Sequence, residues 1–406
     1  MESSIQVATI KPGCAFSCGL LADIQYADVD DAKGRHYRAT LQVLEQAVDF
    51  FNQYDLAFVA HLGDIVDYRN SRMDRDGTAS RAALQEVFRR FGGLRILADE
   101  VGVMSKTALE AQKLVCILGN HELYNFARTG PELTNPPFAK DQQNYYTFCP
   151  AAGWRVVVLD PYDFSMMSNG RNMRRGGHYT NPDALRYAEE QYQYILEVAQ
   201  TKGQAVPPEA DRFMSNSGAH DFNGAVGEAQ LKWLYDTLKT ATLANERVLL
   251  FCHVLIHPPQ KRGNYQNLLW NYAEVLNMIH SPECCCVVAC LHGHTHHGSL
   301  FKDVAGIYHI AFESPMFAET GEGRQYQGPW AILESYEDCL VLRGRGNSGS
   351  PVFGDALMDD KGSCIVTLPL RPFLLDHVPS PSRPCDRLGR SHAAPTHADA
   401  ISLNAA

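Results

Sequence analysis

Seven short apolar runs constrain the fold of this chain more than any other feature of its sequence. They cover residues 16–22, 56–62, 114–118, 154–159, 248–252, 287–291 and 307–312. Runs of this length that are rich in β-branched residues and bounded by Gly, Asp, Asn or Pro are typical of strands buried on both faces. We therefore predict a core built from these strands.

Apolar residues at helical spacing lie between several of these runs. The clearest stripes are formed by Leu41, Leu44, Val48 and Phe51, by Leu231, Leu234 and Leu238, and by Leu268, Leu269, Tyr272, Val275 and Leu276. Such stripes are the packing faces of amphipathic helices. Alternating strands and helices predict a layered α/β fold in which helices cover the sheet.

The composition supports a large core and argues against two classes of partner. Of 406 residues, 45% are apolar, and 36 basic residues stand against 46 acidic ones for a net charge of −10. This balance argues against a protein whose main task is to bind nucleic acid. No stretch approaches the roughly 18 consecutive apolar residues of a membrane span, and no secretory signal is recognised at the N-terminus. We expect no nucleic-acid partner and no membrane partner.

The twelve cysteines lie mostly inside apolar runs, and no paired CxxC motif is present. A zinc ribbon is therefore not indicated. The consecutive Cys284, Cys285 and Cys286 cannot pair with one another. We interpret these residues, together with Cys252 and Cys290, as reduced core thiols. Reduced thiols are typical of the cytoplasm, and we expect a cytoplasmic monomer.

Most of the chain is expected to form one domain, residues 1–372. The charged region near 68–101 and the polar region near 168–224 interrupt the alternation of strands and helices, so we interpret them as insertions over one face. Residues 379–406 contain four prolines and no aromatic residue. Such a segment cannot offset its ordering entropy by burial, and we expect a disordered tail.

Polar side chains follow five of the predicted strands. They are Asp23 and Gln25, Asp64 and Asp67, Asn120 and His121, His253, and finally His294 and His296. Open α/β sheets bind ligands at the carboxyl ends of their strands, so these side chains are candidates for one site. Carboxylate, carboxamide and imidazole donors without thiolate favour Mn²⁺, Fe²⁺, Zn²⁺ or Mg²⁺.

One of these carboxylates, Asp64, can offer an oxygen to each of two ions. Two ions about 3.5–4 Å apart can hold a hydroxide and stabilise both the attacking and the leaving oxygen of a phosphoryl displacement. Gly63 and Gly119 lie beside the donors, where the backbone must turn closely around ions or phosphate. Asp67 is assigned a structural role, in which it orients either the turn or His61. The pattern therefore indicates hydrolysis of a phosphate ester or anhydride.

The order of these motifs resembles a known superfamily. Asp-x-Gln at 23–25, Gly-Asp-x-x-Asp at 63–67, Gly-Asn-His-Glu at 119–122, a lone His253 and Gly-His-Thr-His at 293–296 resemble the calcineurin-like metallophosphoesterases across roughly residues 14–315. Longer stretches at 22–28, 118–126, 221–224, 269–272 and 342–346 are similar to the manganese-dependent ADP-ribose/CDP-alcohol diphosphatase branch. Most of the superfamily has His at the position of Gln25. The resemblance implies a four-layer αββα sandwich with a dinuclear metal site at strand carboxyl ends.

The same resemblance implies roles for individual residues. The first ion would be held by Asp23, Gln25, Asp64 and His296, and the second by Asp64, Asn120, His253 and His294. His121 would be a catalytic group near the phosphate, steered by a carboxylate. Asn267 and His257 would lie near the substrate. The cofactors would be two divalent ions, Mn²⁺ first, with Mg²⁺, Zn²⁺ or Fe²⁺ as alternatives.

The implied function is hydrolysis of the diphosphate bond in a small nucleotide substrate. ADP-ribose would give AMP and ribose 5-phosphate, and CDP-alcohols would give CMP and a phosphorylated alcohol, through water held between the ions. One alternative is a protein Ser/Thr phosphatase or another phosphomonoesterase or phosphodiesterase, although Gln25 and the paired His294 and His296 favour the diphosphatase branch. The other is a non-catalytic scaffold, although such proteins usually lose ligands and this chain has all seven donors.

Overall fold

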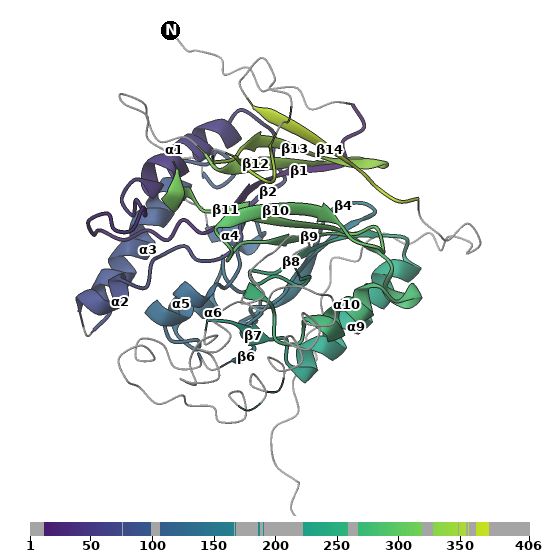
Figure 1. Ribbon diagram of the computed structural model, residues 1–406, viewed down its shortest axis with the longest axis horizontal. Coiled ribbons are helices and arrows are strands. Elements are labelled where there is room, and N and C mark those ends of the chain that lie inside the picture. Colours follow the sequence, from purple (N-terminus) through teal and green to yellow (C-terminus); the bar gives the residue numbers. More distant parts are fainter. Residues whose placement is uncertain are drawn as a thin grey trace, which may run out of the picture.

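The computed structural model describes residues 12–74, 76–98, 106–165, 222–258, 267–318, 328–347, 349–354 and 363–372, with the single residues 167, 186, 190 and 356. Two six-stranded sheets stack on each other, and helices flank them on opposite sides (Figure 1). The predicted four-layer αββα sandwich is therefore confirmed.

The first sheet has the strand order β14-β13-β12-β1-β2-β3. Its strands are β1 (Phe16–Leu21), β2 (Phe58–His61), β3 (Leu114–Cys116), β12 (Trp330–Ser335), β13 (Cys339–Arg345) and β14 (Cys364–Pro369). β1, β2 and β3 are parallel, and β12 pairs with β1 in the antiparallel sense. The carboxyl ends of β1, β2 and β3 thus meet at one edge of this sheet.

The second sheet has the order β10-β11-β9-β8-β5-β4. Its strands are β4 (Tyr146–Ala151), β5 (Trp154–Val158), β8 (Arg247–Phe251), β9 (Val287–His292), β10 (His297–Lys302) and β11 (Tyr308–Glu313). β5, β8, β9 and β11 are parallel. A separate pair is formed by β6 (Phe164–Ser165) and β7 (Gly224–Ala225).

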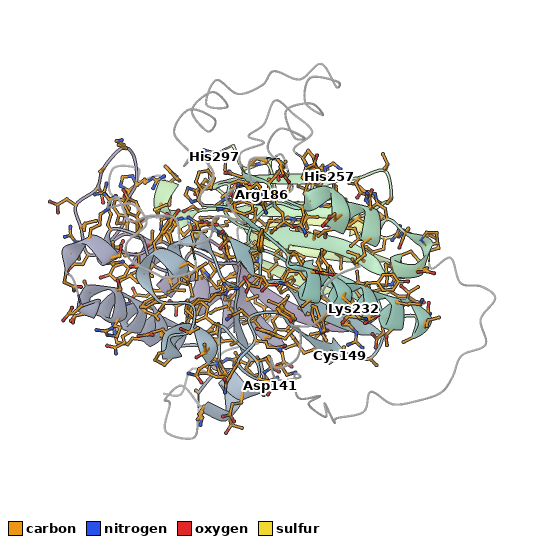
Figure 2. The ribbon with its side chains drawn as sticks, turned by 90° about the horizontal axis from the view of Figure 1, so that it is seen from below. Asp141, Cys149, Arg186, Lys232, His257 and His297 are labelled. Atoms are coloured by element: carbon orange, nitrogen blue, oxygen red, sulfur yellow. The ribbon has the colours of Figure 1, made fainter. Side chains whose placement is uncertain are left out.

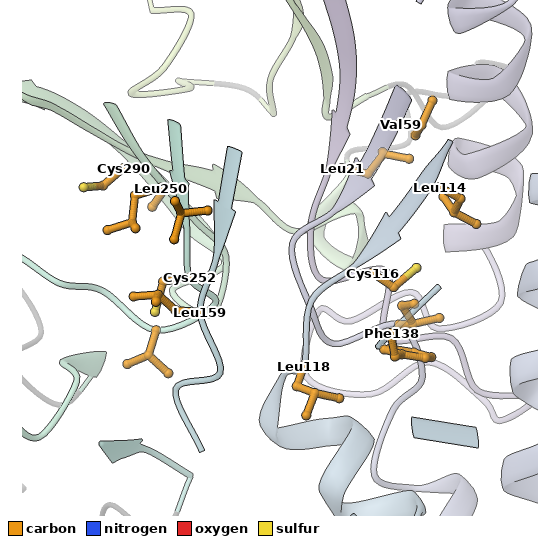
Figure 3. Packing of buried hydrophobic residues seen from close by; sticks show 14 of the residues in the cluster. Leu21, Val59, Leu114, Cys116, Leu118, Phe138, Leu159, Leu250, Cys252 and Cys290 are labelled. Atoms are coloured by element: carbon orange, nitrogen blue, oxygen red, sulfur yellow. The ribbon is translucent and has the colours of Figure 1, made fainter. Parts of the chain in front are cut away.

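Alternation along the strands separates two apolar cores. Between the sheets, Leu20 and Phe58 of the first sheet share a buried cluster with Phe251 and Leu291 of the second. The intervening residues face outward, and Figure 3 shows Val59 and Leu114 on the outer side of one sheet and Leu250 and Cys290 on the outer side of the other. β1, β2, β3, β9 and β11 are buried along their whole length, which explains their nearly continuous apolar sequences.

In the described part of the chain, four long helices form the outer layers. They are α1 (Thr40–Phe51), α3 (Thr78–Phe91), α9 (Glu228–Leu243) and α10 (Tyr272–Ile279). α1 and α3 cover the first sheet, and α9 and α10 cover the second (Figure 1). The shorter elements are α2 (Asn70–Met73), α4 (Lys106–Glu110), α5 (Asn120–Asn125), α6 (Pro131–Thr134), η3 (Pro282–Cys284) and η4 (Pro315–Phe317). Within the described residues, no helix is long and apolar enough to cross a membrane.

All seven apolar runs contain a strand, and the first two helical stripes are confirmed as α1 and α9. The third stripe is partly wrong, because Leu268 forms a β-bridge with Leu255 and the helix begins only at Tyr272. The charged region near 68–101 contains α2 and α3. Most of the region 168–224 and all of the tail 379–406 lie outside the described residues.

Candidate metal centre

The donors that follow the strands lie close together, at the carboxyl ends of parallel strands from both sheets. Ligand atoms of Asp64, His253 and His294 lie within 4.8 Å of one another, and so do those of Asp23, Asp64 and His296. Asp64 is common to both groups and is only 1% exposed. The structure therefore brings together donors from the turns after β1, β2, β8 and β9, with a shared carboxylate at their centre.

Unusual backbone geometry orients these donors. Positive φ angles between 42° and 68° occur at Asp23, Gln25, Asp64, His294 and His296. Such angles are uncommon for residues with a Cβ and persist only where the surroundings enforce them. Two of the turns hold each other, because the Asp23 N–H donates to Gly63 O over 3.0 Å and the Gln25 N–H donates to Asp64 O over 2.9 Å.

The two predicted glycines are required by close approach. A Cβ on Gly119 would lie 2.1 Å from Oδ1 of Asp64, and a Cβ on Gly63 would lie 2.4 Å from Nδ1 of His253. Gly63 also has a φ of +95°. No side chain fits at either position without moving a donor.

The side chain of Gln25 lies between the side chains of Asp64 and His296. Its Nε2 donates to Oδ2 of Asp64 and lies 2.8 Å from Nε2 of His296, while its Oε1 is buried with no hydrogen-bond partner among the described residues. Rotation of the amide by 180° exchanges oxygen and nitrogen at nearly the same positions. That rotation would present an oxygen beside Asp64 and His296, as a cation held there requires.

Hydrogen bonds determine which ring nitrogen of His253 and of His294 carries the proton and which has a lone pair for a cation. Nδ1 of His253 donates to Leu62 O over 2.6 Å, so Nε2 faces Asp64 at 3.4 Å. Nε2 of His294 lies 2.8 Å from Oδ1 of Asn223. Because an amide oxygen only accepts, His294 carries its proton on Nε2 and has a lone pair on Nδ1. Such outer hydrogen bonds are typical of metal-binding histidines.

The electrostatics of the centre fit a group of positive charge. Burial opposes the charge of Asp64, but His121 and His253 lower the pKa of its carboxyl well below the usual range. Burial alone would lower the pKa of His253, whereas Asp64 raises it to about 9. The buried carboxylate thus draws a positive charge into the centre, which a proton supplies when no cation does.

His121 lies at the rim of the donor set. Its backbone N–H donates to Oδ1 of Asp64 over 2.8 Å, and its Nδ1 accepts from the Tyr68 N–H over 3.0 Å. A backbone N–H only donates, so the neutral ring carries its proton on Nε2, which lies 3.9 Å from Oδ2 of Asp64. Oδ2 of Asp67 lies 3.5 Å from Nδ1. Asp67, which the sequence assigned to the turn or to His61, is the neighbouring carboxylate of His121.

Asn120 and Glu122 follow the carboxyl end of β3. Oδ1 of Asn120 accepts from the Tyr162 hydroxyl over 3.4 Å, and the Tyr162 ring lies 6.4 Å from that of His253. A residue with no predicted role is Glu122, whose buried carboxylate accepts from the N–H groups of Asp64, Ile65 and Gly119 over 2.7–2.8 Å. The signal for it was present in the Gly-Asn-His-Glu motif.

The predicted substrate residues lie after β8. The His257 ring packs against Phe301 and His309, with centroids 5.0 and 4.9 Å away, and its half-buried side chain lies near the same edge of the molecule as the exposed His297 (Figure 2). Asn267 is 9% exposed, and its carbonyl accepts from the Leu255 N–H. Neither contact tests a role in substrate binding, so both assignments stay predictions.

Comparison with known families gives a match over most of the chain. Residues 18–298 match the family model described as calcineurin-like phosphoesterase. This range contains every one of the seven predicted metal donors.

Individual relatives agree with the family match. The Arabidopsis thaliana protein named manganese-dependent ADP-ribose/CDP-alcohol diphosphatase is 33% identical over 346 residues, covering 83% of this chain and 96% of the relative. The Homo sapiens protein of the same name is 28% identical, with 82% and 90% covered. A solved dimetal phosphatase from Danio rerio superposes with a TM-score of 0.62 at 26% identity, covering 88% of this chain and 100% of its own.

Proposed function

The chain belongs to the calcineurin-like phosphoesterase family, and we propose that it hydrolyses the diphosphate bond of ADP-ribose and CDP-alcohols with two divalent cations, Mn²⁺ first. The observation that carries this proposal is the convergence of donors from both sheets on Asp64. Relatives that cover most of this chain bear the name of that activity.

Seven residues would hold the cations. Asp23, Gln25 and His296 would take one, Asn120, His253 and His294 the other, and Asp64 would bridge them. Buried Oε1 of Gln25 and Nε2 of His253 have no hydrogen-bond partner in the described part of the chain, which supports the fit. Bound there, two divalent cations supply a hydroxide at neutral pH and neutralise phosphate charge.

The remaining roles fall to residues of the chain itself. His121 presents its Nε2–H toward the centre and would donate to a phosphate oxygen or to the departing phosphate. If the His121 ring took a second proton, Asp67 would stabilise the positive charge of that ring. Glu122 holds the backbone of Asp64 and Gly119, so it positions the shared carboxylate.

A substrate panel tests the proposal. Metal-stripped protein is supplied with Mn²⁺ or Mg²⁺ and assayed with ADP-ribose, CDP-choline and the phosphomonoester p-nitrophenyl phosphate. We expect AMP and ribose 5-phosphate from the first and CMP and phosphocholine from the second. Turnover of the monoester alone would overturn the substrate assignment in favour of a phosphomonoesterase, and failure to bind any cation would favour a scaffold.

We further propose that the enzyme acts as a cytoplasmic monomer on a small nucleotide substrate. Every cysteine that the structure describes is free, with no disulfide among them, which supports a reducing compartment. Light scattering measures the mass in solution, and a mass of two or more chains would contradict the monomer.

A further inference from the structure

A second cluster of metal-binding side chains lies on the outer face of the second sheet. Cys290 and His292 are two residues apart on β9, so they share a face. His309 on β11 is the register partner of Cys290. The thiol and one nitrogen of each imidazole lie within 4.8 Å of one another, and the three side chains are at most 2% exposed.

We propose that Cys290, His292 and His309 form a mononuclear site for a cation of the zinc class, separate from the dinuclear centre. A thiolate with two imidazoles favours Zn²⁺ and disfavours Mn²⁺ or Mg²⁺. The fourth position of a tetrahedral site would be filled by water or a small anion. Cys290 lies among the outward-facing residues of β9 (Figure 3).

The hydrogen bonds of His292 leave one of its ring nitrogens available as a ligand. Nδ1 lies 2.9 Å from Cys252 O and 3.1 Å from Val254 O. Carbonyl oxygens only accept, so Nδ1 carries the proton and Nε2 has the lone pair. Nε2 is buried with no hydrogen-bond partner among the described residues. An unpartnered buried nitrogen is costly, and a cation would satisfy it.

His309 also has one protonated ring nitrogen and one without a hydrogen-bond partner, and here a carboxylate accepts from the protonated nitrogen. Its Nε2 lies 3.1 Å from Oδ2 of Asp303, so the proton sits on Nε2. Nδ1 is buried and, in the described part of the chain, has no hydrogen-bond partner. Asp303 also accepts from the Ile307 N–H and from His280, each over 2.8 Å. A carboxylate that orients a histidine in this way is typical of zinc sites.

The cluster would tie together two strands that lead to the dinuclear centre. β9 continues into the turn with His294 and His296. β11 continues to Ser314, whose hydroxyl donates to Asp23 O over 2.7 Å. A cation held between β9 and β11 would therefore fix the spacing of strands that position donors from both halves.

Cobalt spectroscopy on the intact chain tests the site. The metal-stripped protein is saturated with Mn²⁺ and then titrated with Co²⁺. Cobalt bound to a thiolate gives a near-ultraviolet charge-transfer band, whereas the dinuclear donors include no thiolate. We expect one equivalent of cobalt to give this band and Zn²⁺ to remove it. No band in the wild-type protein would overturn the proposal without bearing on the hydrolase activity.

Variants assign the band to these residues. Cys290→Ser should lose it, whereas Cys286→Ser, which changes another buried thiol, should keep it. Asp303→Asn should weaken zinc binding by about 10–100-fold, as expected for a residue that orients a ligand. If Cys290→Ser does not fold, loss of the band in His309→Asn serves instead. A band that persists in both ligand variants would contradict the assignment.

Discussion

Five of the residues that would hold the cations have a strained backbone. Asp23, Gln25, Asp64, His294 and His296 all adopt positive φ, where each residue with a Cβ costs about 1–3 kcal/mol. Glycine would adopt these angles more easily but offers no donor. The chain thus accepts a less stable backbone at these positions in return for side chains directed at one point.

Removal of the shared carboxylate should abolish both cation binding and hydrolysis. Asp64→Ala leaves Gln25 and the backbone N–H of His121 without the acceptor they share, and it removes the carboxylate that faces His253. We expect bound Mn²⁺ to fall below one ion per chain and kcat to fall at least about 10²–10³-fold. Metal analysis and steady-state kinetics measure these effects, with the exposed Asp55→Asn as control. Substantial residual turnover would exclude Asp64 as the bridge.

A buried histidine outside the donor set should make the fold sensitive to acid. Burial, with a smaller effect of His253, lowers the pKa of His61 from 6.5 to about 3. The unfolded chain therefore binds more protons below pH 6.5, so stability is lost as the pH falls from 6.5 toward 3. From pH 7 to 5 this group should cost roughly 2 kcal/mol of unfolding free energy.

The variant His61→Leu isolates this contribution. Both ring nitrogens of His61 are buried without a hydrogen-bond partner among the described residues, so an apolar side chain of similar size removes no bond there. Urea unfolding at pH 7 and pH 5 should show a smaller loss of stability in the variant than in the wild type. Equal losses in the two proteins would mean that His61 does not titrate as described.

At this scale the sequence predicted the donors but not their partners. Residue type and position after a strand were enough to select Asp23, Asp64 and His253. They could not show that Asp67 lies beside His121, or that Glu122 binds three backbone N–H groups. Those contacts depend on the distance between separate turns, which no local pattern encodes. The sequence also shows Cys290 only as a buried thiol. Its proximity to His309 depends on the register between β9 and β11.

The strand-to-helix connection before α5 leaves no room for added volume at Gly119. Gly119→Ala would place a Cβ 2.1 Å from Oδ1 and 2.5 Å from the backbone nitrogen of Asp64. We expect Mn²⁺ binding to weaken at least tenfold and stability to fall by about 1–3 kcal/mol, the usual cost of overpacking. Calorimetric titration and urea unfolding measure the two effects.

Gly92→Ala is the matched control for this substitution. Gly92 ends α3 with a φ of −58°, and its added Cβ would be 3.2 Å from Arg89 O, at a position remote from the donors. Mn²⁺ affinity should be unchanged in this variant. If Gly119→Ala behaved like Gly92→Ala, close approach to Asp64 would not be the reason for the glycine.

Strands within long continuous apolar runs were predictable, and strands with short or interrupted apolar runs were not. β12 escaped because Glu334 and Ser335 interrupt its apolar run, although both are buried and Glu334 accepts from Arg343 and Tyr336. β13 is buried from residue 340 to 342 and ends with Arg343, Gly344 and Arg345, and β10 is largely half-buried. The start of α10 was predicted too early because a buried β-bridge at Leu268 has the same apolar character as a helix face.

Cation binding should stabilise the molecule as a whole, because the donors come from both sheets. Ligands that bind only the folded state add about 2.7 kcal/mol at a concentration one hundred times Kd. The melting temperature should therefore rise steadily with the logarithm of Mn²⁺ concentration. Asp64→Ala should show no such rise in differential scanning calorimetry. A melting temperature independent of Mn²⁺ in the wild type would contradict the bridging arrangement.

The order of strands has a consequence for synthesis of the chain. β1 lies between β2 and β12, so early and late segments of the polypeptide complete the same sheet. A ribosome releases β1, β2 and β3 long before Trp330, and until then β1 has an open edge that another strand can occupy. Nascent chains halted ahead of β12 should accordingly depend on chaperones, whereas release of β12 should allow this sheet to close.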